Sequence, residues 1–173
     1  MKRLILASLC LTLSAAISFA ADRDVVAIKV ADIHADASVL NGQQHVSTGQ
    51  PDEETLTIAS GAGFVAVIDL RGADEDRGID EVAAVKAAGM QYVSLPVNGA
   101  DGVTFENAAE FDRLLAEFEG PVLVHCASGN RVGALVALRA SAAGASDDEA
   151  LAAGKAAGLT RLEPAVAERL AEE

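Results

Sequence analysis

The stretch VLVHCASGNRVGAL, residues 122–135, decides the fold, because it changes from apolar to polar and back within fourteen positions. The segment VLVHC predicts a buried strand that begins after Pro121, and the segment RVGALVAL predicts a helix. The residues ASGN must then form the tight turn between them. In this arrangement Cys126 faces the N-terminus of the helix, where unpaired amides form a positively polarised cup for an anion.

Several residues of this stretch have a predicted role in anion binding or in shaping the turn. The helix N-terminus favours the thiolate form of Cys126, which is the nucleophilic form. Gly129 can adopt the backbone angles that the cup requires, and Gly133 allows the helix to approach the sheet closely. Arg131 can hold two oxygens of a tetrahedral anion with its planar guanidinium, and a cation at a helix N-terminus is otherwise unfavourable. The alternative is a buried, chemically inert cysteine.

Short apolar runs alternate with amphipathic segments along the rest of the chain. This alternation predicts a single α/β domain whose largely parallel central sheet is flanked by helices. Thr104 is a predicted N-cap, and Ser146 with Glu149 forms a predicted capping box. We expect strands at 25–30, 64–70, 92–95 and 122–125, helices at 53–60, 79–88, 105–118, 132–143, 147–157 and 161–172, an acidic surface loop at 71–80, and a turn at Asn41-Gly42.

The N-terminal segment has the pattern of a secretory signal peptide. Lys2 and Arg3 precede an apolar stretch that ends in Ser-Phe-Ala, immediately before Ala21. We therefore expect residues 1–20 to be removed and residues 21–173 to form the catalytic domain, exported to the periplasm or secreted, with no membrane attachment after cleavage. An uncleaved membrane anchor is the alternative, and the cleavage-like end of the stretch argues against it.

The composition excludes several kinds of partner. The chain has 26 acidic and 13 basic residues, which gives a net charge of −13. A surface this acidic argues against nucleic acid and anionic membranes as partners. His34 and His45 have no partners at metal-ligand spacing, and His125 is expected on the strand face opposite Cys126. The sequence therefore predicts no metal site and no cofactor.

The sequence resembles the protein tyrosine and dual-specificity phosphatases, whose catalytic loop is a strand, His-Cys, a glycine-containing turn, Arg and a helix. It is most similar to a bacterial branch, the beta-lactamase-hydrolase-like phosphatase-like domains. The likeness extends over STGQPDEETL (47–56), GFVAVIDLR (63–71), AAGMQYVSLPVNG (87–99) and VLVHCASGNRVGAL (122–135).

The resemblance implies a cysteine-phosphatase-like fold and a role for each loop residue. Cys126 would be the nucleophile, Arg131 the binder of the oxyanion, and His125 a group that orients the loop. By the same resemblance Arg71 is a structural ion-pair partner. The anion cradle would be the amides of Ala127, Ser128, Gly129, Asn130 and Arg131.

Two departures from the phosphatase pattern keep other functions open. Only four residues separate Cys126 from Arg131, one fewer than in the phosphatases, and Val132 replaces the hydroxyl residue that usually follows the arginine. The shorter spacing is that of rhodanese-like sulfurtransferases, in which a Cys126 persulfide would carry sulfane sulfur from a donor to a thiol acceptor. The sequence thus predicts hydrolysis of a phosphorylated substrate, with sulfur transfer and a non-catalytic module that binds a small oxyanion as alternatives.

A phosphatase also needs a general acid to protonate the departing oxygen. In the family this acid is an Asp on a loop that precedes the cysteine, and Asp101 in VNGADGVTF is the candidate. Gly99 and Gly102 flank it, so its loop could close over the pocket. Asn98 stands where relatives often have an acid, and a solvated turn residue is the alternative interpretation of Asp101.

Overall fold

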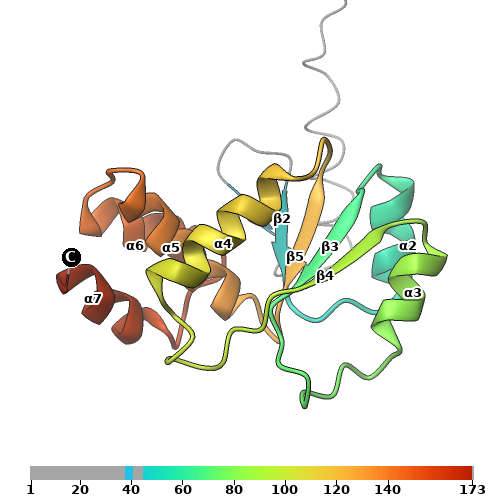
Figure 1. The fold of residues 1–173 in the computed structure, drawn as a ribbon, viewed down its shortest axis with the longest axis horizontal. Coiled ribbons are helices and arrows are strands. Elements are labelled where there is room, and N and C mark those ends of the chain that lie inside the picture. The colour runs from blue at the N-terminus through green and yellow to red at the C-terminus, as the bar shows by residue number, and fades with distance from the viewer. Residues whose placement is uncertain (1–37, 41–44, 173) are drawn as a thin grey trace, which may run out of the picture.

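The computed structural model describes residues 38–40 and 45–172, which form a sheet with helices on both faces (Figure 1). The strand order is β1-β2-β5-β3-β4, and β5 lies in the centre between β2 and β3. Only β1 is antiparallel to its neighbour, so the prediction of a largely parallel sheet is confirmed. The strands are β1 (Ser38–Val39), β2 (Val46–Thr48), β3 (Ala66–Asp69), β4 (Gln91–Ser94) and β5 (Val122–His125).

The helices divide into two groups that cover opposite faces of the sheet (Figure 1). Two of them, α2 and α3, pack over Val67 and Leu123. On the other face lies a second core that contains Ile68 and Val124, and on that side α6 and α7 pack against α5. Cys126 belongs to the second core, as the alternation of side chains along β5 requires. The helices are α2 (Glu53–Gly61), α3 (Glu81–Ala87), α4 (Phe105–Ala116), α5 (Asn130–Ala142), α6 (Asp147–Ala156) and α7 (Glu163–Ala171).

Cap signals in the sequence located the starts of α4 and α6 correctly, whereas the predicted starts of α3, α5 and α7 are each two residues off. The Thr104 side chain accepts a hydrogen bond from the amide of Asn107 at 3.1 Å. The predicted capping box of Ser146 and Glu149 begins α6. The strand β2 was not predicted, because three buried residues are too short to show a periodicity.

Several sequence predictions lie outside the described residues. These are the signal peptide, the strand at 25–30, the turn at Asn41-Gly42 and His34. Within the described ranges, no helix combines the length and the apolar character that crossing a bilayer would need. His45 lies just before β2, and its Nδ1 accepts a hydrogen bond from the amide of Val122 at 3.1 Å. Burial lowers the pKa of His45, which suits this acceptor role.

The expectation that Gly133 brings a helix close to the sheet is wrong. A Cβ atom at this position would lie 2.1 Å from the amide nitrogen of Leu159 and 2.6 Å from the carbonyl oxygen of Gly154. The close approach is therefore between α5 and the end of α6. It draws the turn after α6 against the start of α5, where the candidate site lies.

Candidate active site

Cys126 follows the central strand directly and is a buried, free thiol. The chain then passes through Ala127 and Ser128, which are exposed, to Gly129. Gly129 has a φ of 73° and is the N-cap of α5, so the glycine supplies the left-handed conformation that ends the turn. The predicted strand, turn and helix are confirmed, and Arg131 stands in the first turn of α5.

Contacts from two sides brace this loop. The backbone of Ser128 forms an isolated antiparallel bridge with Gly49, just after β2. On the other side, the Asn130 side-chain oxygen accepts hydrogen bonds from the amides of Thr160 at 2.8 Å and Leu162 at 3.3 Å.

The Arg131 guanidinium is held by one carboxylate and two main-chain carbonyls. Its NH1 and NH2 atoms lie 2.5 Å and 2.7 Å from the two carboxylate oxygens of Glu75. NH1 also donates to the carbonyl oxygens of Leu70 at 3.3 Å and Val97 at 3.1 Å. These contacts do not use Nε, and the guanidinium lies near enough to Cys126 for the charge of the sulfur to raise the pKa of the arginine. The arginine is thus fixed beside the sulfur with a donor left for an anion.

Arg131 and Glu75 each stabilise the charged form of the other. The hydrogen bond from Arg131 is the main cause that lowers the pKa of Glu75 to about 2, with a smaller contribution from Arg71. The pKa of Arg131 is raised first by Glu75, and the charge of Cys126 acts in the same direction. Burial opposes the charged state of both residues. The ion pair therefore persists across the whole range around neutral pH.

The stretch 71–80 is more than the acidic surface loop that the sequence predicted. It carries Glu75 to Arg131, and it begins with Arg71, which is buried. Arg71 Nε lies 3.2 Å from Glu75, and its NH2 donates to the carbonyl oxygen of Asp76. Arg71 is thus an ion-pair partner, as predicted. Glu75 was missed, because nothing in the sequence distinguishes it from the acidic residues around it.

His125 lies on the opposite face of β5 from Cys126, in contact with α3. Its Nε2 is 2.6 Å from a carboxylate oxygen of Glu81 and 3.6 Å from one of Asp69, and all three side chains are fully buried. Asp69 in turn accepts hydrogen bonds from the Tyr92 hydroxyl and from Arg77 Nε, each at 2.7 Å. Burial and the bond to Asp69 raise the pKa of Tyr92 to about 12.

Asp69, Glu81 and His125 are close enough to hold a metal ion, since one ligand atom from each lies within 4.8 Å of the others. The spacing test applied to the sequence could not find this cluster, because its members come from β3, α3 and β5. Arg77 already provides a cation, at 2.7 Å from Asp69 and 3.6 Å from Glu81. With Arg77 the cluster forms a buried ion-pair network, in which the Nδ1 atom of His125 has no hydrogen-bond partner among the described residues.

Asp101 lies in an exposed turn between β4 and α4. Gly99 has a positive φ of 53°, and the amide of Gly102 donates to the carbonyl oxygen of Asn98 at 3.0 Å, which closes the turn. The turn begins one residue after Val97, whose carbonyl holds Arg131. Asp101 therefore follows closely in the chain after Val97, the residue whose carbonyl binds Arg131. The role of Asp101 as an acid stays a prediction.

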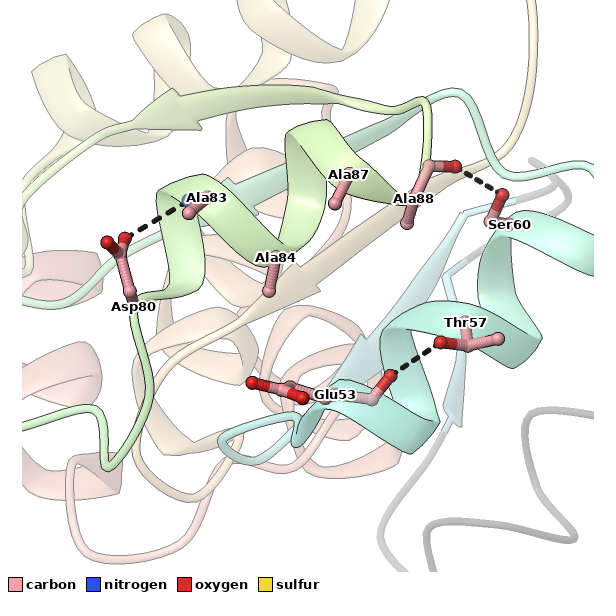
Figure 2. Close-up of a pocket in the computed structure, with 8 residues that line it drawn as sticks. All are labelled: Glu53, Thr57, Ser60, Asp80, Ala83, Ala84, Ala87 and Ala88. Carbon is pink, nitrogen blue, oxygen red and sulfur yellow. Dashed lines mark hydrogen bonds between the residues drawn. The ribbon is translucent and has the colours of Figure 1, made fainter.

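A surface hollow elsewhere on the molecule carries none of this chemistry. It lies between α2 and α3, and its walls are mainly alanine side chains of α3 (Figure 2). Two of the polar side chains around it are engaged in the helices, since Asp80 caps α3 and Ser60 donates to the carbonyl oxygen of Ala88. The hollow is on the face of the sheet opposite the core that contains Cys126.

A parallel sheet whose central strand ends in a cysteine, followed by a tight turn, an anchored arginine and a helix, defines the cysteine phosphatase fold. The family model described as "Beta-lactamase hydrolase-like protein, phosphatase-like domain" matches residues 36–145. The chain belongs to this family.

Relatives and solved structures agree with this assignment. Beta-lactamase hydrolase-like proteins of Agrobacterium fabrum and Xylella fastidiosa are 36% and 38% identical over 94 and 95 residues. The matches cover 52% and 53% of this chain but only 22% of each relative. An inferred phosphatase from Neisseria meningitidis has a TM-score of 0.65 at 22% identity, over 76% of this chain and 96% of that one. TpbA of P. aeruginosa, solved with phosphotyrosine, has a TM-score of 0.61 at 21% identity, over 78% and 82%.

Replacing Glu75 by Gln should lower the free energy of unfolding in a pH-dependent way. Because the pKa of Glu75 is depressed to about 2 in the folded state, its stabilising effect is complete above its ordinary value of 4.5. The effect should fade as the pH drops from there toward about 2. Denaturant unfolding of both proteins between about pH 7 and pH 3 measures this gap. A gap that stays constant as the pH falls would contradict the ion pair.

Proposed function

We propose that the protein hydrolyses phosphate monoesters through a phosphorylated Cys126. The observation that carries this proposal is the Arg131 guanidinium, anchored by Glu75 and two carbonyls beside the sulfur at the N-terminus of α5. A guanidinium and helix amides are the donors that stabilise the equatorial oxygens of a phosphoryl group in flight. The membership of a phosphatase-like family supports the same reaction.

The reaction would proceed in two displacements. First the Cys126 thiolate attacks phosphorus, the bond to the ester oxygen breaks, and Asp101 protonates that oxygen as it leaves. Then a water molecule gives a proton to the ionised Asp101 as it attacks the cysteinyl phosphate, the phosphorus–sulfur bond breaks, and phosphate and thiolate are released. Arg131 and the loop amides would hold the same three oxygens in both steps. His125, bound to Glu81, would keep the loop in place.

The proposal extends to the substrate and its location. TpbA was solved with phosphotyrosine, which makes an aryl phosphate a reasonable first substrate for this chain. The net charge of −13 favours a small or weakly charged substrate over nucleic acid or an anionic membrane. The signal-like N-terminus supports action in the periplasm or outside the cell.

Sulfur transfer is the second candidate, and the length of the loop favours it. Four residues between Cys126 and Arg131 make a smaller cup than five would. The buried Val132 has no hydroxyl to stabilise the departing thiolate during hydrolysis of a phosphoenzyme. In this reaction the thiolate would attack the sulfane sulfur of thiosulfate and release sulfite. The resulting persulfide would pass its sulfur to a thiol acceptor.

Two measurements on the purified protein separate these candidates: the release of phosphate from an aryl phosphate, and the intact mass of the protein after incubation with thiosulfate. We expect phosphate release from an aryl phosphate and no lasting gain of mass with thiosulfate. The Cys126→Ser variant, as the control, should release no phosphate. A stable sulfur adduct on Cys126, without phosphate release, would replace the phosphatase by a sulfurtransferase. Tight oxyanion binding with neither product would leave a non-catalytic binding module.

The role of Asp101 is tested by the leaving group. Changing Asp101 to Asn should slow hydrolysis of alkyl phosphates by about 100-fold or more, because their poor leaving groups need a proton. Hydrolysis of aryl phosphates with acidic leaving groups should change much less. The comparison of kcat for the two substrate classes measures this difference. An equal effect on both classes would remove Asp101 from the proton transfer.

A further inference from the structure

Gln50 stands between the two charged networks of the site. It follows β2, in the segment STGQP, and its side chain is partly buried. Its amide oxygen accepts a hydrogen bond from NH1 of Arg71, and its Nε2 donates to Glu81 at 3.0 Å. One neutral side chain therefore contacts a cation with one end and an anion with the other.

Each of these two contacts leads to a residue of the cysteine loop. Arg71 contacts Glu75 at 3.2 Å, and Glu75 binds Arg131 with both of its carboxylate oxygens. On the other branch, Glu81 lies 2.6 Å from His125, the residue before Cys126. Gln50 thus joins the support of the guanidinium to the support of the nucleophile, although the two branches lie on different faces of the sheet.

An amide side chain is needed to make both contacts of Gln50, with its oxygen toward Arg71 and its nitrogen toward Glu81. The Glu81 side chain is fully buried, so its oxygen needs the donor that Nε2 provides. A leucine would leave both Glu81 and Arg71 without this partner. A glutamate could still accept from Arg71, but it would bring a second carboxylate against Glu81, which is unfavourable in a buried position.

We infer that Gln50 is a positioning residue that sets the place of Arg131 relative to Cys126. This inference rests on the proposed binding of an oxyanion by Arg131. When the Gln50 amide is lost, Arg71 and Glu75 lose one of their fixed neighbours, and the guanidinium shifts from the position in which it meets the anion. A small displacement of a group that positions the substrate can lower the rate by a large factor, even when the mutated residue lies far from the reacting atoms.

The test compares Gln50→Leu and Gln50→Glu with Gln91→Leu, a matched control in which the same replacement is made at an exposed glutamine of β4. Calorimetry gives the Kd of inorganic phosphate, steady-state kinetics give kcat and KM for an aryl phosphate, and denaturation shows that each variant folds. We expect both Gln50 variants to bind phosphate about fivefold or more weakly and to lose about tenfold in kcat. The Gln91 variant should match the wild type in both.

The outcomes distinguish this inference from the proposed function. Folded Gln50 variants with wild-type phosphate affinity and kcat, or with lower stability alone, would overturn the positioning role. A wild type that binds phosphate without hydrolysing any ester would overturn only the phosphatase. The change in phosphate affinity would then decide the role of Gln50 alone. A wild type that binds no phosphate would overturn the inference as well, because Arg131 would hold no oxyanion.

Discussion

The ion pair between Arg131 and Glu75 is the interaction on which the rest of the site depends. A cation in the first turn of a helix is repelled by the helix dipole, so its presence there must be compensated. The compensation comes from Glu75 and from the carbonyls of Leu70 and Val97. Leu70 directly follows β3 and Val97 comes soon after β4, whereas Glu75 comes from the loop between β3 and α3, so the sheet and this loop together set the position of the guanidinium. A rigid scaffold thereby holds an otherwise mobile side chain beside the sulfur.

Side chains on both faces of the sheet support the loop that contains Cys126. His125 and Cys126 are neighbours in sequence, but the strand directs their side chains to opposite faces. On one face, His125 enters a buried network with Asp69, Glu81 and Arg77. On the other face, the sulfur meets the start of α5 and Arg131. The charged groups around His125 and those beside the sulfur are thus on opposite faces of the sheet.

The features that could be predicted from the sequence are those that depend on neighbouring residues in the chain. The strand and turn around Cys126, the position of Gly129 and the caps at Thr104 and Ser146 follow from periodicity and from capping chemistry, and the structure confirms them. Glu75, Glu81 and Gln50 could not be found in this way, because their partners lie far away in the sequence and their residue types are common on surfaces. For the same reason the close approach at Gly133 was assigned to the sheet, whereas its partner is the end of α6.

The most direct measurement is the rate at which Cys126 of the wild type is alkylated by iodoacetate, an anion, and by iodoacetamide, its neutral counterpart, with the Cys126→Ser variant as the control. An electropositive site made by Arg131 and the N-terminus of α5 predicts that iodoacetate reacts faster than iodoacetamide, because the site attracts the anion to the sulfur. Equal rates, or a faster reaction with iodoacetamide, would mean that no electropositive site faces the sulfur, and would contradict the binding of an oxyanion beside Cys126.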